Sequence, residues 1–456
     1  MRNFSAARRT IGPVGTVAVA LVLGGCTTDI LDVGTPDVLS GAALSGSLGA
    51  TTLRHGAIRE FGVAFSGTID GFVVSTGNMA DEVQTSDTFA DRFFTDGRKQ
   101  TEVLGGATNT MYNNLQTSRA GLNSAIAAWR AAKVNPVTAV NDSLAELYAL
   151  RGLSETFFAE AYCSGVPFSN VASDGSFVYG NPLTTAQMLA RATASFDSAT
   201  SLTGSTTAGN VARIGKGRAL LNLGQFSQAA AAVNGVPTTF KYLSYHSDAT
   251  GAQNNGIFNA ATVSASRYTA GTREGINGID FMSTPADPRA PWAASTRTGF
   301  DGTSRNLPVQ LKYTALGSAV PIAEGVEARL IEAEARLNAT TGGSQADRDA
   351  MFALLNTLRA TGITPAMPAM AAAPTTQSEA VDMLFKERAL WLWLTGHRLG
   401  DMRRLIRQYG RTAANVFPTG AMSLRPGDTY GTDVNFIVPF PEKNNPNFTG
   451  CIDRNP

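Results

Sequence analysis

The sequence has few of the residues that metal sites and many enzymes require. Its 456 residues include only three cysteines and three histidines, and charged residues make up 16%. His55, His246 and His397 each lack a second histidine or cysteine three or four positions away, so a zinc or iron site is not expected. The formal net charge of +1 argues against nucleic acid, which needs a basic face to neutralise phosphates.

Motifs of catalysis and cofactor binding are also missing. No Gly-x-Ser-x-Gly elbow occurs, and Gly215-Lys216-Gly217 lacks the leading glycine and the trailing Ser or Thr of a phosphate-binding loop. Asp81 and Glu82 are adjacent in sequence, a spacing that carries no information about catalytic geometry. We therefore expect no catalytic residues, no metal and no cofactor.

The chain has no apolar run long enough to cross a bilayer, which needs about 20 residues. The apolar segment near the start, residues 11–23, is too short to span; it follows Arg2, Arg8 and Arg9 and is followed by Gly24-Gly25-Cys26. The pattern predicts a signal peptide over residues 1–25, removed so that Cys26 becomes the lipidated N-terminus. An ordinary secretory signal with a chance cysteine is the alternative. Residues 26–49, rich in Gly, Ser, Thr and Asp, are expected to be a flexible tether before a body over residues 50–456.

The two remaining cysteines are Cys163 and Cys451. An even remainder in an oxidising compartment favours a disulfide, which would hold the C-terminal end of the chain against the body. The alternative is that both cysteines are buried as free thiols, too far apart to form a bond.

Helical periodicity dominates the rest of the chain, so we expect a mainly α architecture. Apolar residues three and four apart occur in residues 111–132, 140–162, 185–202, 210–233, 326–338, 345–360 and 378–409. Between residues 237 and 321 the pattern is lost, and Gly, Asn, Ser and Thr are frequent. This stretch predicts a loop-rich, irregular insertion with a few short strands, and such long loops usually carry function.

One block has the pattern of a tetratricopeptide helical hairpin. In residues 215–230, small residues allow two helices to approach, Leu223-Gly224 ends the first helix, Phe226 fills the turn, and Ala229 starts the second. A single hairpin cannot bury its apolar face alone, so similar partners are expected. Residues 140–168 and 327–338 are more degenerate candidates.

The segment from Glu387 to Arg404 resembles the C-terminal signature of the SusD/RagB family of outer-membrane nutrient-binding lipoproteins. The matching residues are Glu387, Arg388, Gly396, His397, Arg398, Asp401 and Arg404. Further pieces follow the family's order: residues 112–126, 162–168, 287–289, 332–335, 355–359, 438–441 and 445–447. Trp391 and Thr395 depart from the pattern, since the family usually has glutamates there, and Leu399-Gly400 replaces the family's usual aromatics.

The resemblance implies a SusD-like α-α superhelix of tetratricopeptide-like hairpins with a loop-rich ligand face. It also implies a lipid-anchored protein on the cell surface, in the outer membrane, that caps a SusC-like TonB-dependent transporter and takes part in nutrient uptake. Such a protein would bind a glycan or other oligomeric nutrient and present it for import without making or breaking bonds. A tetratricopeptide scaffold lipoprotein in envelope assembly and a surface polysaccharide hydrolase are the alternatives.

Within the signature, Gly396 and Gly400 indicate close approach by another element, because glycine in a helix interior otherwise costs stability. We expect His397, Arg398, Asp401 and Arg403 to form hydrogen-bonded pairs that orient this helix. An acid/base cluster is the functional alternative.

A glycan site needs aromatic rings for the apolar faces of sugars and short polar groups for their hydroxyls. In the irregular region Trp292 is the first choice, with Tyr268, Phe300 and Tyr313 as further aromatic candidates. A buried packing role is the alternative for Trp292. A second candidate surface is the polar stretch of residues 78–91, in which Asn78 and Asp81 are the residues chosen.

Overall fold

The computed structural model describes residues 46–456 except for 102–104, 133–136, 173–175, 203–205 and 264–265. The expected signal peptide, Cys26 and nearly all of the expected tether lie outside the described residues. The tether was expected to extend to Gly49, but helix α1 already begins at Gly46, and Gly49 and Ala50 are buried. Burial of these small residues explains why a Gly- and Ser-rich stretch is helical here.

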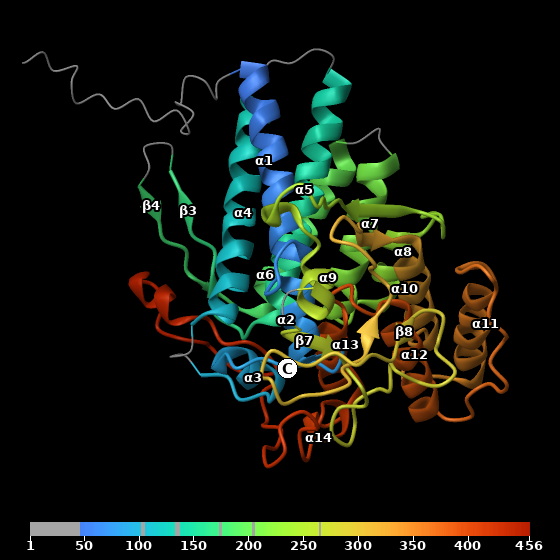
Figure 1. Ribbon diagram of the computed structural model, residues 1–456. Coiled ribbons are helices and arrows are strands. Elements are labelled where there is room, and N and C mark those ends of the chain that lie inside the picture. The colour runs from blue at the N-terminus through green and yellow to red at the C-terminus, as the bar shows by residue number, and fades with distance from the viewer. Residues whose placement is uncertain (1–45, 102–104, 133–136, 173–175, 203–205, 264–265) are drawn as a thin grey trace, which may run out of the picture. The chain divides into compact units, whose positions relative to one another are not determined.

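Helices dominate the described residues and confirm the mainly α prediction (Figure 1). They are α1 (Gly46–Ser66), α2 (Phe72–Met79), α3 (Ala90–Asp96), α4 (Ala107–Ala131), α5 (Val137–Ala161), α6 (Thr185–Leu202), α7 (Thr206–Asn222), α8 (Phe226–Val233), α9 (Gly256–Phe258), α10 (Gly325–Leu337), α11 (Gln345–Thr361), α12 (Gln377–Trp391), α13 (Arg398–Tyr409) and α14 (Ala413–Val416).

The long helices pack against one another in sequence order. The helix α1 packs on α4, α5 on α6, α6 on α7, α7 on α8, and α10 on α11, as Figure 1 shows for α1, α4 and α5, which run alongside each other. At the predicted tetratricopeptide hairpin a Cβ on Gly217 would lie 2.7 Å from Val233, so the small residue allows α7 and α8 to approach. The second helix begins at Phe226 and not at Ala229 as expected, because the turn needs only residues 223–225.

The prediction of a single helix over residues 378–409 is wrong. The structure has α12 and α13 with a break between them, in which Leu394 and Gly396 have φ values of 54° and 75°. A Cβ on Gly396 would lie 2.8 Å from the ring of Phe72 at the start of α2. Packing of α2 against this point therefore interrupts a sequence whose apolar periodicity is continuous, and glycine tolerates the left-handed backbone.

The strands are short and form two-stranded antiparallel pairs. They are β1 (Val83–Thr85) with β7 (Tyr268–Ala270), β2 (Val166–Pro167) with β5 (Pro182–Leu183), β3 (Asn170–Val171) with β4 (Phe177–Val178), β6 (Lys241–Ser244) with β10 (Val320–Glu324), and β8 (Trp292–Ala293) with β9 (Val309–Gln310). Residues 237–321 are irregular with a few short strands, as the sequence predicts. The β1–β7 pair joins segments that are nearly 200 residues apart, with Gln84 opposite Thr269.

The core is one cluster that extends through all the long helices. Within it, four phenylalanines from α1, α2 and α5 pack together: Phe61, Phe65, Phe72 and Phe157, with 4.2 Å between the ring centroids of Phe72 and Phe157. No helix among the described residues is long and apolar enough to cross a membrane.

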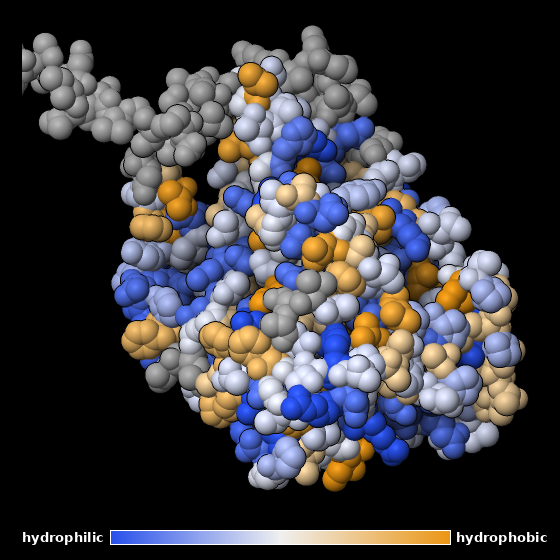
Figure 2. Space-filling view, viewed as in Figure 1, coloured by the Kyte–Doolittle hydropathy of each residue, from blue (hydrophilic) through white to orange (hydrophobic). Residues whose placement is uncertain are grey.

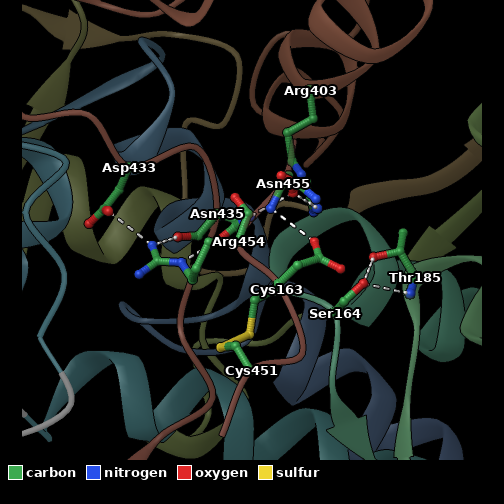
Figure 3. Close-up of a disulfide and its surroundings, with 10 residues drawn as sticks. Cys163, Ser164, Thr185, Arg403, Asp433, Asn435, Cys451, Arg454 and Asn455 are labelled. Atoms are coloured by element: carbon green, nitrogen blue, oxygen red, sulfur yellow. Dashed lines mark hydrogen bonds and ion pairs between the residues drawn. A yellow bond between two sulfur atoms is a disulfide. The ribbon is translucent and has the colours of Figure 1, made fainter.

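A disulfide joins Cys163, just after α5, to Cys451 near the C-terminus, with 5.9 Å between their Cα atoms (Figure 3). The sequence left this pairing open. Around it the C-terminal strap is held by further bonds: the Cys163 N–H donates to Phe436 O at 2.9 Å, and Arg454 forms an ion pair with Asp433 at 3.0 Å. The C-terminal end of the chain is therefore fixed to the helical body.

Candidate functional site

The signature residues lie at the α12–α13 break and are buried. Arg388 in α12 donates twice to Asp401 in α13, at 2.8 and 2.9 Å, and Arg404 donates to the same carboxylate at 2.8 Å and to Glu334 of α10. Arg398 binds Asp81 at 2.7 and 2.8 Å and so joins α13 to the end of α2. We call Asp81, Glu334, Arg388, Arg398, Asp401 and Arg404 the junction network.

Every charged group of the junction network has a partner of opposite charge. Burial alone would raise the pKa of Asp401, but Arg388 and Arg404 outweigh burial and hold that pKa well below its usual range. His397 lies 3.1 Å from Glu327, and Arg403 donates to the carbonyls of Ala159 and Glu160. Glu387 pairs with Arg289 and Arg359 at 2.6 and 2.7 Å. This geometry fits the structural interpretation, because the network is closed to solvent and its charges are neutralised internally.

Four of the six predicted ligand residues lie in the interior. Tyr268, Tyr313, Asn78 and Asp81 are each 3% exposed or less. Their polar atoms are bonded within the protein: Tyr268 Oη donates to Asp70 at 2.9 Å, Tyr313 Oη to Leu394 O at 3.0 Å, and Asn78 Nδ2 to Arg92 O at 2.9 Å. The expectation of ligand contact is corrected for these four, because the tertiary packing encloses them.

The other two candidates reach the surface. Trp292 is half-buried in β8, and its indole Nε1 donates to Ser283 O at 3.0 Å. Phe300 is 39% exposed and lies in a loop after β8. This loop is anchored to the ends of β1 and β7, since the Phe300 N–H donates to Ser266 O and the Asp301 N–H to Ser86 O.

Phe300 belongs to an exposed group of aromatic and charged side chains that the sequence analysis did not assemble. The guanidinium of Arg267 lies 3.9 Å from the ring centroid of Phe300 and 5.1 Å from that of Phe89, which is 52% exposed. Arg92 also lies over Phe89, at 5.0 Å. We call Phe89, Arg267 and Phe300 the aromatic platform.

A buried carboxylate fixes the geometry of the aromatic platform. Asp87 accepts from Arg267 at 2.8 and 3.1 Å and also accepts from Arg92. Burial by itself would raise the pKa of Asp87, but the bonds from Arg267 and Arg92 outweigh burial and lower it. Asp87 is therefore ionised at neutral pH and holds both guanidinium groups beside the rings. A third arginine, Arg425, donates to Asp87 O and lies 3.9 Å over Phe93.

The β1–β7 pair is what brings the platform together. Phe89 lies within the polar stretch of residues 78–91, and Phe300 belongs to the irregular insertion, so one residue from each of the two candidate regions contributes to the same surface. Phe89 and Arg267 were missed. The available signal for Phe89 was a lone aromatic residue in a stretch that is otherwise mostly polar, with three aspartates and two threonines.

Elsewhere a cavity of about 640 Å³ lies between α1, α5 and β6. Ile58, Leu150 and Tyr242 supply apolar walls, and Tyr245 and His246 complete it on the β6 side. Its size suits one small ligand, whereas an oligomer needs an open surface such as the aromatic platform.

Among the described residues no group of three or more His, Cys, Asp or Glu is arranged to hold a metal ion.

No family model and no curated protein matches the sequence. Solved structures do match it along most of its length. A SusD superfamily protein from Bacteroides thetaiotaomicron VPI-5482 is similar with a TM-score of 0.67 and 15% identity, covering 89% of this chain and 99% of that one. A SusD-like carbohydrate-binding protein from Bacteroides fragilis NCTC 9343 is similar with a TM-score of 0.65, 13% identity and the same coverage.

The chain has the SusD fold. A laminarin-binding SusD-like protein is a further structural neighbour, with a TM-score of 0.59, 13% identity, and coverage of 90% of this chain and 99% of that one. At such low identity the comparison shows a shared arrangement of helices. It does not show which side chains of this chain form a binding site.

Two departures from the family signature have local explanations within this SusD fold. Trp391, at the end of α12, lies 5.2 Å from the guanidinium of Arg289. Thr395 Oγ1 lies 2.9 Å from His397 Nδ1 and 2.5 Å from Leu392 O, within the α12–α13 break. Thr395 therefore bonds within the break, whereas Trp391 packs beside Arg289.

Proposed function

We propose that this chain is a SusD/RagB-type lipoprotein that binds a glycan at the aromatic platform. The observation that carries the proposal is the exposed pair Phe89 and Phe300 with Arg267 held between them, on a SusD fold. Aromatic rings offer apolar contact to sugar faces, while guanidinium N–H groups donate to hydroxyl oxygens. Several structural neighbours, described as carbohydrate-binding or laminarin-binding, support this ligand class.

Anchoring and delivery complete the proposed function. Cys26 would carry the lipid that holds the protein on the outer membrane, and a TonB-dependent transporter would receive the glycan. Support for this part comes from the lipoprotein processing pattern at Leu23-Gly24-Gly25-Cys26 and from the resemblance of residues 387–404. Binding and presentation need no catalytic residue. The proposed site consists of aromatic rings, guanidinium groups and the Asp87 carboxylate, which is bonded to Arg267 and Arg92.

The binding test is affinity electrophoresis and calorimetry of the mature protein against a panel of polysaccharides that includes laminarin. We expect Phe89→Ala and Phe300→Ala each to weaken binding by about tenfold, a typical loss for an aromatic contact at the centre of a binding surface. Phe440→Ala is the matched control, because Phe440 is 58% exposed and lies outside the platform.

Equal binding by the Phe89 and Phe300 variants and the wild type would remove the platform from the proposal. Absence of binding to every polysaccharide, together with a co-purifying assembly complex, would favour the scaffold alternative. Release of oligosaccharide products by the purified protein would contradict a binding-only function. The transporter is tested separately, by isolating the lipidated protein in detergent and identifying whether a barrel protein accompanies it.

A further inference from the structure

The β3–β4 hairpin carries an exposed apolar surface that neither the fold nor glycan binding explains. Val171 in β3 is 56% exposed, and Phe177, Val178 and Tyr179 in and after β4 are 69%, 52% and 44% exposed. Figure 2 shows hydrophobic side chains on the flank where Figure 1 places β3 and β4. Apolar side chains gathered in this way on a protein surface commonly mark a contact with a partner or a membrane.

Both faces of the hairpin are uncovered. Successive residues of a strand point to opposite faces, and Phe177 and Val178 are neighbours that are each more than half exposed. A hairpin lying on the protein body would have one buried apolar face and one polar face. Instead the rings of Phe177 and Tyr179 stack on each other, with centroids 6.2 Å apart, and cover neither core nor cavity.

The base of the hairpin, in contrast, is firmly fixed. Asn170 Oδ1 accepts from Arg119 at 3.1 Å and from Asn123 at 2.9 Å, both in α4, and the Gly180 N–H donates to Ser169 Oγ at 3.1 Å. Exposed apolar side chains on strands with a fixed base suit a preformed contact element, since little conformational entropy remains to be lost on binding.

We propose that the β3–β4 hairpin inserts into the interfacial region of a lipid bilayer and orients the protein on it. Tyr is enriched at that depth, where its ring is in the apolar part and its hydroxyl meets water, and Phe adds apolar area. Between residues 169 and 180 the sequence has one charged residue, Asp174. Insertion is limited to the interface, because the outer edges of a two-stranded hairpin have backbone groups that need water.

The proposed tether makes this contact geometrically accessible. About 20 residues separate Cys26 from the start of α1 at Gly46, which allows a reach of at most roughly 70 Å. In Figure 1 the hairpin extends from α4 toward the end of the bundle at which α1 begins. Lipid chains would hold the protein at the membrane, and the hairpin would add a second, weaker contact that fixes its orientation. This last step rests on the lipid anchor of the proposed function, but insertion itself does not.

The experiment therefore uses the mature chain with Cys26→Ser, which cannot be lipidated, and vesicles of zwitterionic phosphatidylcholine. We expect flotation to show vesicle binding that falls about tenfold or more in the variant Phe177→Ser/Val178→Ser/Tyr179→Ser. Tyr245→Ser is the control, since Tyr245, just after β6, is 80% exposed and lies outside the hairpin. Unchanged circular dichroism and unchanged glycan affinity of the hairpin variant separate this test from that of the glycan site.

A second measurement covers the case of weak binding. An environment-sensitive fluorophore on Val171→Cys, in the lipidated protein reconstituted in the same vesicles, is expected to brighten and shift to the blue relative to the same label on Tyr245→Cys. Equal emission from the two labels, with no vesicle binding of the Cys26→Ser chain, would overturn the proposal. Loss of self-association or of a bound barrel in the hairpin variant, with vesicle binding unchanged, would assign the hairpin to a protein partner and also overturn it.

Discussion

The junction network and the aromatic platform are built from the same residue types and differ in what surrounds them. In both, aspartates bind two arginines: Asp401 binds Arg388 and Arg404, and Asp87 binds Arg92 and Arg267. At the junction these side chains are 6% exposed or less, whereas Arg267 is 19% exposed and lies between two exposed rings. An arginine–aspartate pair is therefore structural where both partners are enclosed, and part of a candidate binding surface where the arginine stays partly exposed beside exposed rings.

The comparison predicts the largest loss of stability at the junction. Arg404→Ala leaves Glu334, which is fully buried, and Asp401 with fewer positive partners, and breaking such a buried pair costs about 3–5 kcal/mol. Urea denaturation measures the free energy of unfolding. Arg411→Ala is the control, because its partner Asp382 is 66% exposed and exposed pairs contribute less than about 1 kcal/mol. Equal losses in the two variants would contradict the distinction between buried and open pairs.

A carboxyl group beside the junction network has no positive partner in bonding contact and predicts a pH effect. Glu82 is buried and accepts from the Leu394 N–H at 2.9 Å. Burial, aided by the charge of Asp81, raises the pKa of Glu82 to about 8. Between pH 4.5, its ordinary pKa, and about 8, the unfolded chain loses this proton while the folded chain keeps it. The Glu82 contribution to stability is thus full below pH 4.5 and is lost as pH rises to about 8.

Glu82→Gln removes this titration while keeping a carbonyl oxygen for the Leu394 N–H. We expect the free energy of unfolding of the wild type to fall more steeply from pH 5 to pH 8 than that of the variant. The difference is several kcal/mol at most, because each pKa unit corresponds to about 1.4 kcal/mol. Urea denaturation at both pH values measures it, and parallel pH dependence in the two proteins would show that Glu82 is ionised when folded.

The aromatic platform is expected to respond in the opposite way, with affinity affected more than stability. Arg267→Met removes the cation between Phe89 and Phe300 but leaves Asp87 paired with Arg92 and with two backbone N–H groups. No buried charge becomes unpaired, so the stability cost should stay near 1 kcal/mol. Loss of the cation–π and hydrogen-bond contacts should weaken glycan binding by about fivefold. Calorimetry and denaturation of the same preparation give both values; a loss of stability like that of Arg404→Ala would place Arg267 with the structural pairs.

The smallest effect is expected at Trp292, the aromatic residue that the sequence favoured. Its ring is half-buried and its Nε1 is bonded to Ser283 O, so less of it is available to a ligand than of Phe89. Trp292→Ala should weaken glycan binding less than about threefold, which is about 0.6 kcal/mol. Affinity electrophoresis on the polysaccharide with the strongest binding measures the change. A tenfold loss would move the centre of the site from the platform to β8.

Particular residues show why part of the site was predictable and part was not. Phe300 was selected because an irregular, aromatic-containing insertion is a typical place for ligand contacts, and it is exposed on the platform. Tyr268 satisfied the same criterion but its ring is buried and its hydroxyl bonds to Asp70. Composition cannot distinguish the two, since the exposure of a side chain depends on which distant segment packs over it.

The sequence by itself determined properties that depend on local order: helical periodicity, the tetratricopeptide-like turn at residues 223–225, and the signature at residues 387–404. Tertiary structure decided where continuity ends and which segments meet. Packing of Phe72 against Gly396 divides a periodic stretch into α12 and α13, and pairing of β1 with β7 brings residues from two weak candidate regions onto one platform. Periodicity is set by neighbours along the chain, whereas burial and strand pairing are set by contacts between residues up to hundreds of positions apart.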